Sequence, residues 1–397
     1  MHYSRIGGDG QIKDGQIKDG SPLIRGPIRF WYHPRPRSAG KQSLWRAREG
    51  GASAPRGRVD PARKREMIEE ILPGLHRVVV PLSGNPLKEI NSYVLTSSDR
   101  NLIIDTGMKR PECQEVLDAG LDEIGVDLER TDFIATHLHA DHAGLISTLL
   151  RSGSRAFMGS LDAQVMKIDF AHLTKTIPLS EYAIRSGFPA EEVRASLHNH
   201  PGNKYSSQIT VDYIPLEGGE SFEVGAYRLE VVATPGHTNG HISLYEPDKK
   251  LFFSGDHVLG DITPNIQAWS DDHDPLATYL SSLKKANQLD VELCLPGHRS
   301  LIEDCGKRIG ELVEHHRVRA NEVMSILKTG SRSGYETAAQ MSWDIEAPSW
   351  EEFPLMQRWF ATGEAVAHVR YLEEKGMVQR QTVDDRVIYS ANGTSRL

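Results

Sequence analysis

The stretch Thr136-His137-Leu138-His139-Ala140-Asp141-His142 decides the fold prediction for this chain of 397 residues. It follows the apolar run 133–135, so we expect a strand to end there and a loop to begin. Side chains two positions apart on a strand point the same way, so His137 and His139 can direct their imidazoles to one point. The following turn directs Asp141 and His142 to a second point beside the first. Imidazole and carboxylate suit Zn²⁺, Fe²⁺ or Mn²⁺, so the spacing predicts two adjacent metal ions.

Three more residues of ligand type occur downstream in the same strand-to-loop setting: His237, Asp256 and His298. Each follows an apolar β-type run, at 229–232, 251–253 and 291–295. Each also lies beside a glycine, which lets the backbone turn sharply at the end of a strand. The two sets together provide seven candidate metal ligands, namely His137, His139, Asp141, His142, His237, Asp256 and His298.

These motifs, with Asp105 in Ile104-Asp105-Thr106-Gly107, resemble the metallo-β-lactamase superfamily over residues 67–310. The resemblance implies an α/β fold, a four-layer αβ/βα sandwich with the metals at one edge of two packed sheets. It implies that Asp105 orients a ligand by hydrogen bonding. It further implies one metal on His137, His139 and His237, the other on Asp141, His142 and His298, and a bridge formed by Asp256 and a hydroxide.

Two divalent ions this close would lower the pKa of a shared water toward neutrality and polarise the attacked oxygen, which predicts hydrolysis. Asp141 and Asp256 are the candidate catalytic residues, and Asp141 could accept a proton or steer the hydroxide. An aspartate at 256 argues against a true β-lactamase and points to glyoxalase II-like, lactonase-like and nuclease-like branches. The interval from Asp256 to His298 is too short for the β-CASP insertion of one nuclease group. His139, without a flavodoxin-like segment, argues against the flavodiiron branch.

Composition predicts a globular chain of two domains and a tail, since 39% of the residues are hydrophobic. We expect no membrane span, because no apolar run approaches the roughly 20 residues that one requires, and no signal peptide. The three cysteines, Cys113, Cys294 and Cys305, lack metal-type spacing. Free thiols and a cytoplasmic location are therefore expected.

Residues 1–66 differ from the rest, with 15 Lys+Arg against 6 Asp+Glu and a tandem Gly-Gln-Ile-Lys-Asp-Gly repeat. Such a stretch cannot bury enough apolar surface to order itself, so we expect a disordered or non-native extension. A basic interaction arm and a targeting presequence are alternatives. We favour translation from Met67, because the first coherent fold segment opens there.

Strands are predicted at 75–80, 91–95 and 101–105 and a helix at 111–124. Residues 161–206 instead show helical patterns, at 161–174, 179–187 and 190–198. This insert lies between the second and third ligand motifs, so we predict that it forms a substrate-selecting wall. Its candidate contact residues are Tyr182, His198, His200, Lys204 and Tyr205.

Residues 311–397 form the predicted C-terminal module, with helices at 308–327, 335–341 and 354–374 before strand-like runs at 376–380 and 386–389. This order resembles the winged helix of several superfamily hydrolases, including endoribonucleases of the lactamase-β-like branch. The module has 10 Lys+Arg against 13 Asp+Glu, whereas a nucleic-acid module should present a basic face. The apolar series Trp350, Phe353, Trp359 and Phe360 instead predicts an interface, and hence a homodimer.

The sequence thus predicts a cytoplasmic, dinuclear metal-dependent hydrolase of glyoxalase II-like, that is hydroxyacylglutathione hydrolase-like, type. Its substrate would be a small-molecule thioester, lactone or other ester, and its metals two zinc ions, with iron or manganese as alternatives. The alternative function is a metal-dependent endoribonuclease or phosphodiesterase that holds RNA with the winged-helix-like module.

Overall fold

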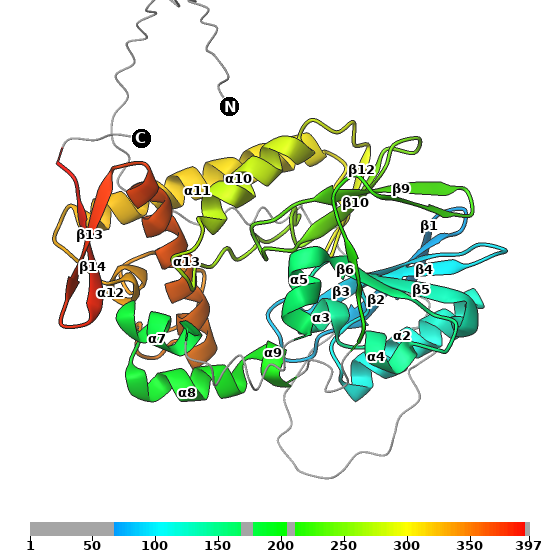
Figure 1. Cartoon of the computed structure of the whole chain (residues 1–397), viewed down its shortest axis with the longest axis horizontal. Helices are drawn as coiled ribbons and strands as arrows, with labels where there is room; N and C mark the ends of the chain where they lie inside the picture. The colour runs from blue at the N-terminus through cyan, green and yellow to red at the C-terminus, as the bar shows by residue number, and fades with distance from the viewer. Residues whose placement is uncertain (1–66, 168–177, 205–210, 394–397) are drawn as a thin grey trace, which may run out of the picture. The chain divides into compact units, whose positions relative to one another are not determined.

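A computed structural model describes residues 67–167, 178–204 and 211–393 of the chain (Figure 1). The predicted extension 1–66, the end of the helix predicted at 161–174 and the candidate contact Tyr205 lie outside these residues. No helix within the described ranges is both long enough and apolar enough to cross a membrane.

Two β-sheets form the centre of the fold. The first has the order β1 to β7, antiparallel from β1 to β4 and parallel from β4 to β7. The second has the order β12-β11-β10-β9-β8, with β11 and β12 parallel. The strands are β1 (Ile68–Leu72), β2 (Leu75–Pro81), β3 (Glu89–Leu95), β4 (Asn101–Ile104), β5 (Thr131–Ala135), β6 (Ala156–Gly159), β7 (Ile214–Leu216), β8 (Ser221–Val224), β9 (Tyr227–Ala233), β10 (Ile242–Glu246), β11 (Leu251–Gly255) and β12 (Leu293–Pro296).

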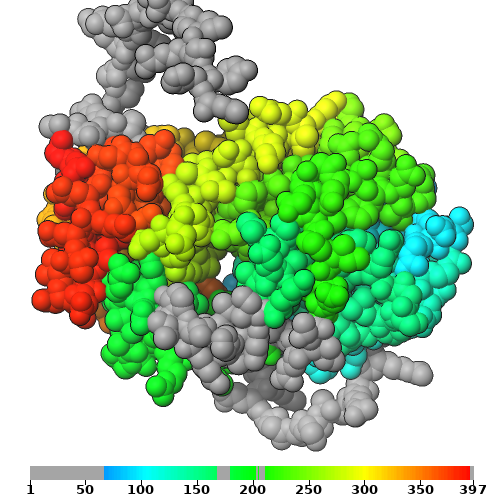
Figure 2. All heavy atoms as spheres, viewed as in Figure 1, coloured from blue at the N-terminus to red at the C-terminus, as the bar shows by residue number. Residues whose placement is uncertain are grey.

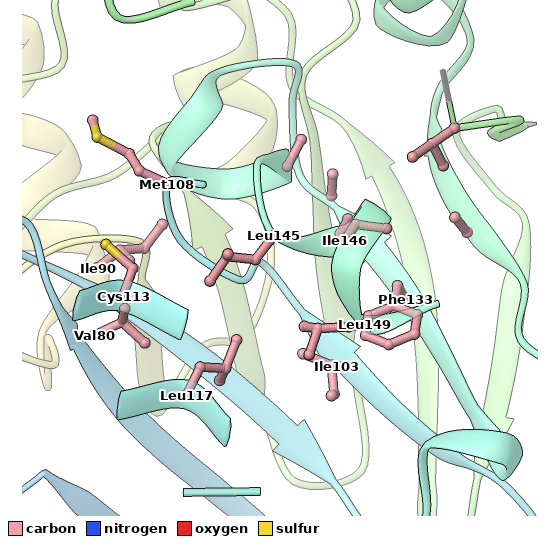
Figure 3. Packing of buried hydrophobic residues seen from close by; sticks show 14 of the residues in the cluster. Val80, Ile90, Ile103, Met108, Cys113, Leu117, Phe133, Leu145, Ile146 and Leu149 are labelled. Atoms are coloured by element: carbon pink, nitrogen blue, oxygen red, sulfur yellow. The ribbon is translucent and has the colours of Figure 1, made fainter. Parts of the chain in front are cut away.

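The sheets pack face to face because alternate residues of each strand point to opposite faces. In β3, Tyr93 and Leu95 join a buried cluster that contains Leu244 and Phe253 of the second sheet. On the opposite face of the first sheet lie the helices α2 (Pro111–Ile124), α3 (Ala140–Ala143) and α4 (Ile146–Leu149). Figure 3 shows this outer layer, where Cys113, Leu117, Leu145 and Leu149 lie over Val80, Ile90, Ile103 and Phe133.

The second sheet is covered on its outer face by α10 (Pro275–Ala286) and α11 (Cys305–Leu327). Phe252 and Cys294 of this sheet are fully buried in one cluster with Leu276, Leu283 and Ile309 of these two helices. The order of layers is therefore helices, sheet, sheet, helices, which confirms the predicted four-layer αβ/βα sandwich.

The strand directions bring the chemical motifs to one edge. Asp105 directly follows β4, and the metal-ligand stretch from Thr136 follows β5, its parallel neighbour. In the second sheet, Asp256 and His298 follow the parallel strands β11 and β12, whose register pairs Gly255 with Pro296. Carboxyl ends of parallel strands meet at one edge, and a polar site is expected there.

The region predicted as a helical insert contains the helices α5 (Ser160–Met166), α7 (Pro178–Arg185), α8 (Ala190–Asn199) and α9 (Pro201–Lys204). The C-terminal helices are α12 (Gly334–Ala338) and α13 (Leu355–Glu374), followed by the hairpin β13 (Val378–Val383) and β14 (Arg386–Ala391). Its two-residue turn has positive φ at Asp384 and Asp385, 48° and 61°, as a type I′ turn requires. Helix α11 runs across residue 310, so the domain boundary predicted there does not coincide with the end of an element.

The aromatic series of the C-terminal module packs against residues of its own chain, and the interface predicted from it stays a prediction. Trp359 is 1% exposed and stacks on Trp269, with ring centroids 4.3 Å apart. Its ring also meets Phe188, which belongs to the insert, at 5.2 Å. Figure 2 shows the same proximity, with the green α7 and α8 beside the red C-terminal residues. The sequence pattern did not reveal this because the insert is far away along the chain. Trp350, Phe353 and Phe360 likewise pack against residues of their own chain.

Candidate metal centre

The side chain of Asp105 positions Thr136 and His142 by hydrogen bonding. Its backbone has a φ of 58°, a conformation that non-glycine residues adopt rarely and often for a functional reason. Its Oδ1 accepts the backbone N–H of Thr136 at 2.8 Å, and its Oδ2 accepts from His142 Nδ1 at 2.7 Å. Because Nδ1 of His142 donates here, Nε2 is the nitrogen that faces the site, and without a proton it could bind a metal.

One group of imidazoles comes from both halves of the sandwich. Nδ1 of His139 lies 2.9 Å from Nε2 of His137 and 3.0 Å from Nε2 of His237. On the far side of its ring, His237 donates from Nδ1 to the carbonyl of Asn265 at 2.9 Å, so its Nε2 presents a lone pair. The ligand-type atoms of the three histidines all lie within 4.8 Å of one another.

A second group is formed by Asp141, His142 and His298, whose ligand-type atoms also lie within 4.8 Å of one another. His298 Nε2 is 3.4 Å from Oδ2 of Asp141, while its Nδ1 donates to the Glu89 carbonyl at 2.6 Å. The backbone of β3 thus orients a side chain that follows β12, and Nε2 is the ring nitrogen left to face the site.

The Asp256 carboxylate lies between the two groups. Its Oδ1 is 3.4 Å from Nε2 of both His142 and His298, and its Oδ2 is 3.5 Å from Nε2 of His237. One oxygen therefore faces each group. If a cation were bound in each group, Asp256 could contact both.

The donor atoms fit two divalent metals. His142 Nε2, His298 Nε2 and Asp256 Oδ1 are buried without a hydrogen-bond partner. Buried polar atoms are rarely left unpaired, because the loss of hydration costs about 1–3 kcal/mol for each. A cation would satisfy all three atoms, and the combination of imidazole and carboxylate ligands is one that zinc, iron and manganese accept.

The charges of the site favour a cation. Burial alone would raise the pKa of Asp256, but the neighbouring His298 and His142 hold it well below its usual range. Burial opposes the charged form of His142, yet the carboxylates of Asp105 and Asp256 hold its pKa well above the ordinary value. Burial lowers the pKa of His139 to about 3, which keeps this ring neutral. A proton on His142 would therefore compete with a metal for the same nitrogen.

Two residues that hold the site were missed from the sequence. Buried Asp162 of α5 accepts from Leu138 N at 3.0 Å, Gly240 N at 2.8 Å and Thr238 Oγ1 at 2.7 Å. It thereby ties the loop of His137 and His139 to the loop of His237. His241 accepts the backbone N–H of Asp256 on Nε2 at 3.1 Å. Its place four residues after His237 was a usable signal, whereas nothing in the sequence links Asp162 to either loop.

The residues of the insert that we predicted to contact the substrate lie in the following environments. The Tyr182 hydroxyl lies 3.4 Å from Asp271 Oδ1, and the His200 ring packs 5.8 Å from that of Phe360. His198 and Lys204 are exposed. The substrate-selecting role of the insert stays a prediction.

The fold and the site now define a class. A model of the metallo-β-lactamase superfamily matches residues 86–298, and a model of the metallo-β-lactamase-like C-terminal domain matches residues 350–391. The chain belongs to the metallo-β-lactamase superfamily.

Solved structures share this fold. A metallo-β-lactamase family protein from Thermus thermophilus is 27% identical, with a TM-score of 0.68 over 81% of this chain and 100% of that one. A β-lactamase domain protein from Burkholderia ambifaria, 24% identical, has a TM-score of 0.65 over 82% of this chain and 95% of that one.

Curated relatives have a similar level of sequence identity. An atrochrysone carboxyl ACP thioesterase from Aspergillus novofumigatus is 26% identical over 67% of this chain and 67% of its own length. A beta-lactamase-like protein 2 homolog from Caenorhabditis elegans is 26% identical over 66% of this chain and 74% of its own length. The chain thus spans about two thirds to three quarters of these relatives.

Proposed function

We propose that the protein is a dinuclear metal-dependent hydrolase of a small-molecule thioester, lactone or other ester. The observation that carries the proposal is the position of Asp256, with one oxygen toward His237 and the other toward His142 and His298. Two divalent ions at such a centre supply a hydroxide at neutral pH and polarise the oxygen of the substrate. Zinc is the expected metal, with iron and manganese as alternatives.

The protein residues have distinct proposed roles. Asp256 and Asp141 are the catalytic carboxylates, since each combines ligand geometry with an ionised side chain. The pKa of Asp141 is about 2, because the contact with His298 and the charge of His142 outweigh the effect of burial. An ionised carboxylate at this position can accept a proton or orient the attacking water.

The thioester class has the most support among the substrates. Similar proteins include ACP thioesterases from Aspergillus novofumigatus and Emericella nidulans, each 26% identical to this chain. A thioester carbonyl is readily attacked by hydroxide, and its thiolate leaves without needing a strong acid. A glyoxalase II-like activity, on an acyl-glutathione, falls within this class.

RNA cleavage is less well supported by the contacts of the C-terminal module. Arg358 pairs with Glu192 at 2.9 Å, and Arg370 and Arg380 pair with Asp271 at 3.0 and 2.6 Å. Arginines held by carboxylates are poorly placed to neutralise phosphates.

A substrate panel tests the proposal. Protein reconstituted separately with zinc, iron and manganese is assayed with acyl-glutathione, acyl-CoA and acyl-ACP thioesters, homoserine lactones, a phosphodiester and single-stranded RNA. We expect thioester or ester turnover that His142→Ala abolishes. Turnover of the phosphodiester or RNA alone would overturn the proposal in favour of the nuclease.

A further inference from the structure

The segment 256–274 connects the metal centre to the C-terminal helices. It begins with Asp256, and the carbonyl of Asn265, further along, accepts the Nδ1 proton of His237 at 2.9 Å. The orientation of the His237 ring therefore depends on where the backbone of Asn265 lies.

Helix α13 holds Asn265 from the other side. Asn265 Nδ2 donates to Oε2 of Glu364 at 2.8 Å. The side chain of Glu364 is 12% exposed, and its Oε1 lies 3.5 Å from Nε of Arg319 in α11, which is 5% exposed. The connection from α11 through α13 to His237 is thus largely shielded from water, where hydrogen bonds to a charged group are strongest.

The residue before Glu364 makes a second contact with the same segment. The carbonyl of Gly363 accepts the N–H of Ala268 at 3.1 Å. A Cβ atom on Gly363 would lie 2.9 Å from Oε1 of Gln267 and from the ring of Trp269, closer than real Cβ atoms approach. A side chain at position 363 would push Gln267 or Trp269 away, so the glycine lets α13 lie close to the segment. Two successive residues of one helix thus position the segment that supports His237.

We infer that Glu364 is a positioning residue for the metal centre, acting through Asn265 on the ring of His237. The inference rests on the metal centre proposed above. It gives the C-terminal module a role in metal binding although the module contributes none of the seven candidate ligands. Partners that orient ligand histidines typically change metal affinity by about 10–100-fold when they are lost.

The test measures metal binding instead of turnover. Apoprotein carrying Glu364→Ala, Asn265→Ala, both changes or Glu364→Gln is titrated with zinc against a chromophoric chelator, and the cobalt-substituted forms are compared by visible absorption. Glu374→Ala, at the exposed end of the same helix, is the matched control.

We expect Glu364→Ala and Asn265→Ala each to weaken the binding of one of the two ions by about 10–100-fold and to change the cobalt spectrum. The double variant should bind as weakly as the single ones, because both act in one chain of contacts. Glu364→Gln should restore most of the affinity, since its amide oxygen can still accept from Asn265.

Wild-type affinity and cobalt spectrum in Asn265→Ala would overturn the inference, even if Glu364→Ala failed to fold. A lower melting temperature of apo Glu364→Ala with unchanged metal affinity would show that Glu364 only packs. If the unaltered protein bound no metal, the proposed function itself would fail. If that protein bound two ions and the variants matched it, only this inference would fail.

Discussion

Oδ2 of Asp162 lies 3.0 Å from the backbone nitrogen of Leu138, the residue between two candidate metal ligands. The same carboxylate accepts from Gly240 N and from Thr238 Oγ1, beside the third candidate ligand His237. A Cβ at Gly240 would stand 2.2 Å from the Asp162 nitrogen, so the two loops meet where only glycine fits. One side chain of α5 thus fixes the separation of the two loops that carry the candidate ligands His137, His139 and His237.

Asp162→Ala should therefore weaken both the fold and the metal centre. It leaves buried donors unpaired, which should lower the free energy of unfolding by about 1–3 kcal/mol. Urea unfolding of the apoprotein measures this loss in the free energy of unfolding, and chelator competition measures the loss of metal affinity. Asp122→Ala, on the exposed face of α2, is the control. Unchanged metal affinity in Asp162→Ala would contradict the positioning role.

Replacement of Asp256, the carboxylate proposed to bridge the two ions, should change the number of bound ions as well as the rate of turnover. Asp256→Ala removes the oxygens that face both groups, and His142→Ala removes a ligand from one group. We expect fewer bound ions and turnover lower by about two orders of magnitude or more. Metal analysis by mass spectrometry and initial rates check this, with Asp290→Ala as an exposed control. Two ions and full activity in either variant would refute the ligand assignment.

Metal removal should lower the melting temperature. The candidate ligands follow strands of both sheets, so ions bound only to the native state would join the two halves of the sandwich. An ion at 1,000 times its dissociation constant adds about 4 kcal/mol to the stability. Calorimetry with and without a chelator tests this in the wild type, and the shift should shrink in His142→Ala. An equal melting temperature in both conditions would count against the centre.

Away from the metal ligands, the His316 and His368 pair predicts a pH dependence of stability. His316 Nδ1 lies 3.1 Å from His368 Nε2, and His368 Nδ1 donates to the Glu364 carbonyl. Burial lowers the pKa of His368 to about 3, and burial with the charges of His368, His315 and Arg319 lowers that of His316 further below its ordinary value.

Both pKa values are lower in the folded state, so the unfolded chain binds more protons below about pH 6.5. Stability from the pair is present above that pH and is lost as the pH falls, by about 1.4 kcal/mol per unit for each histidine. Urea unfolding of the apoprotein between pH 7 and 5 should show a shallower slope in His316→Gln than in the wild type. Val383→Ala, on an exposed residue without a titratable group, should keep the wild-type slope. Equal slopes in His316→Gln and wild type would exclude the effect.

The sequence predicted those helices and strands whose residues follow a clear local pattern. Helix α2 begins and ends where predicted, at Pro111 and Ile124, because a proline starts it and Gly125 ends it with φ at 80°. The ligand stretch was recognisable because its residues are adjacent. Asp162, Asn265 and Glu364 were not, since each acts through a contact between segments far apart in the chain. The partner of Trp359 was missed for the same reason.

The burial of Trp359 within its own chain allows the homodimer prediction to be tested. Its ring is enclosed by Trp269 and Phe188 of its own chain, so Trp359→Ala should cost about 3–5 kcal/mol of stability by leaving a cavity. That loss should be the same at every protein concentration, because no second chain is needed to bury the ring. Denaturant unfolding over a hundredfold range of concentration, with Val383→Ala on an exposed apolar residue as control, checks it. A loss that grows on dilution, together with sedimentation as a dimer, would show that the aromatic series also serves an interface.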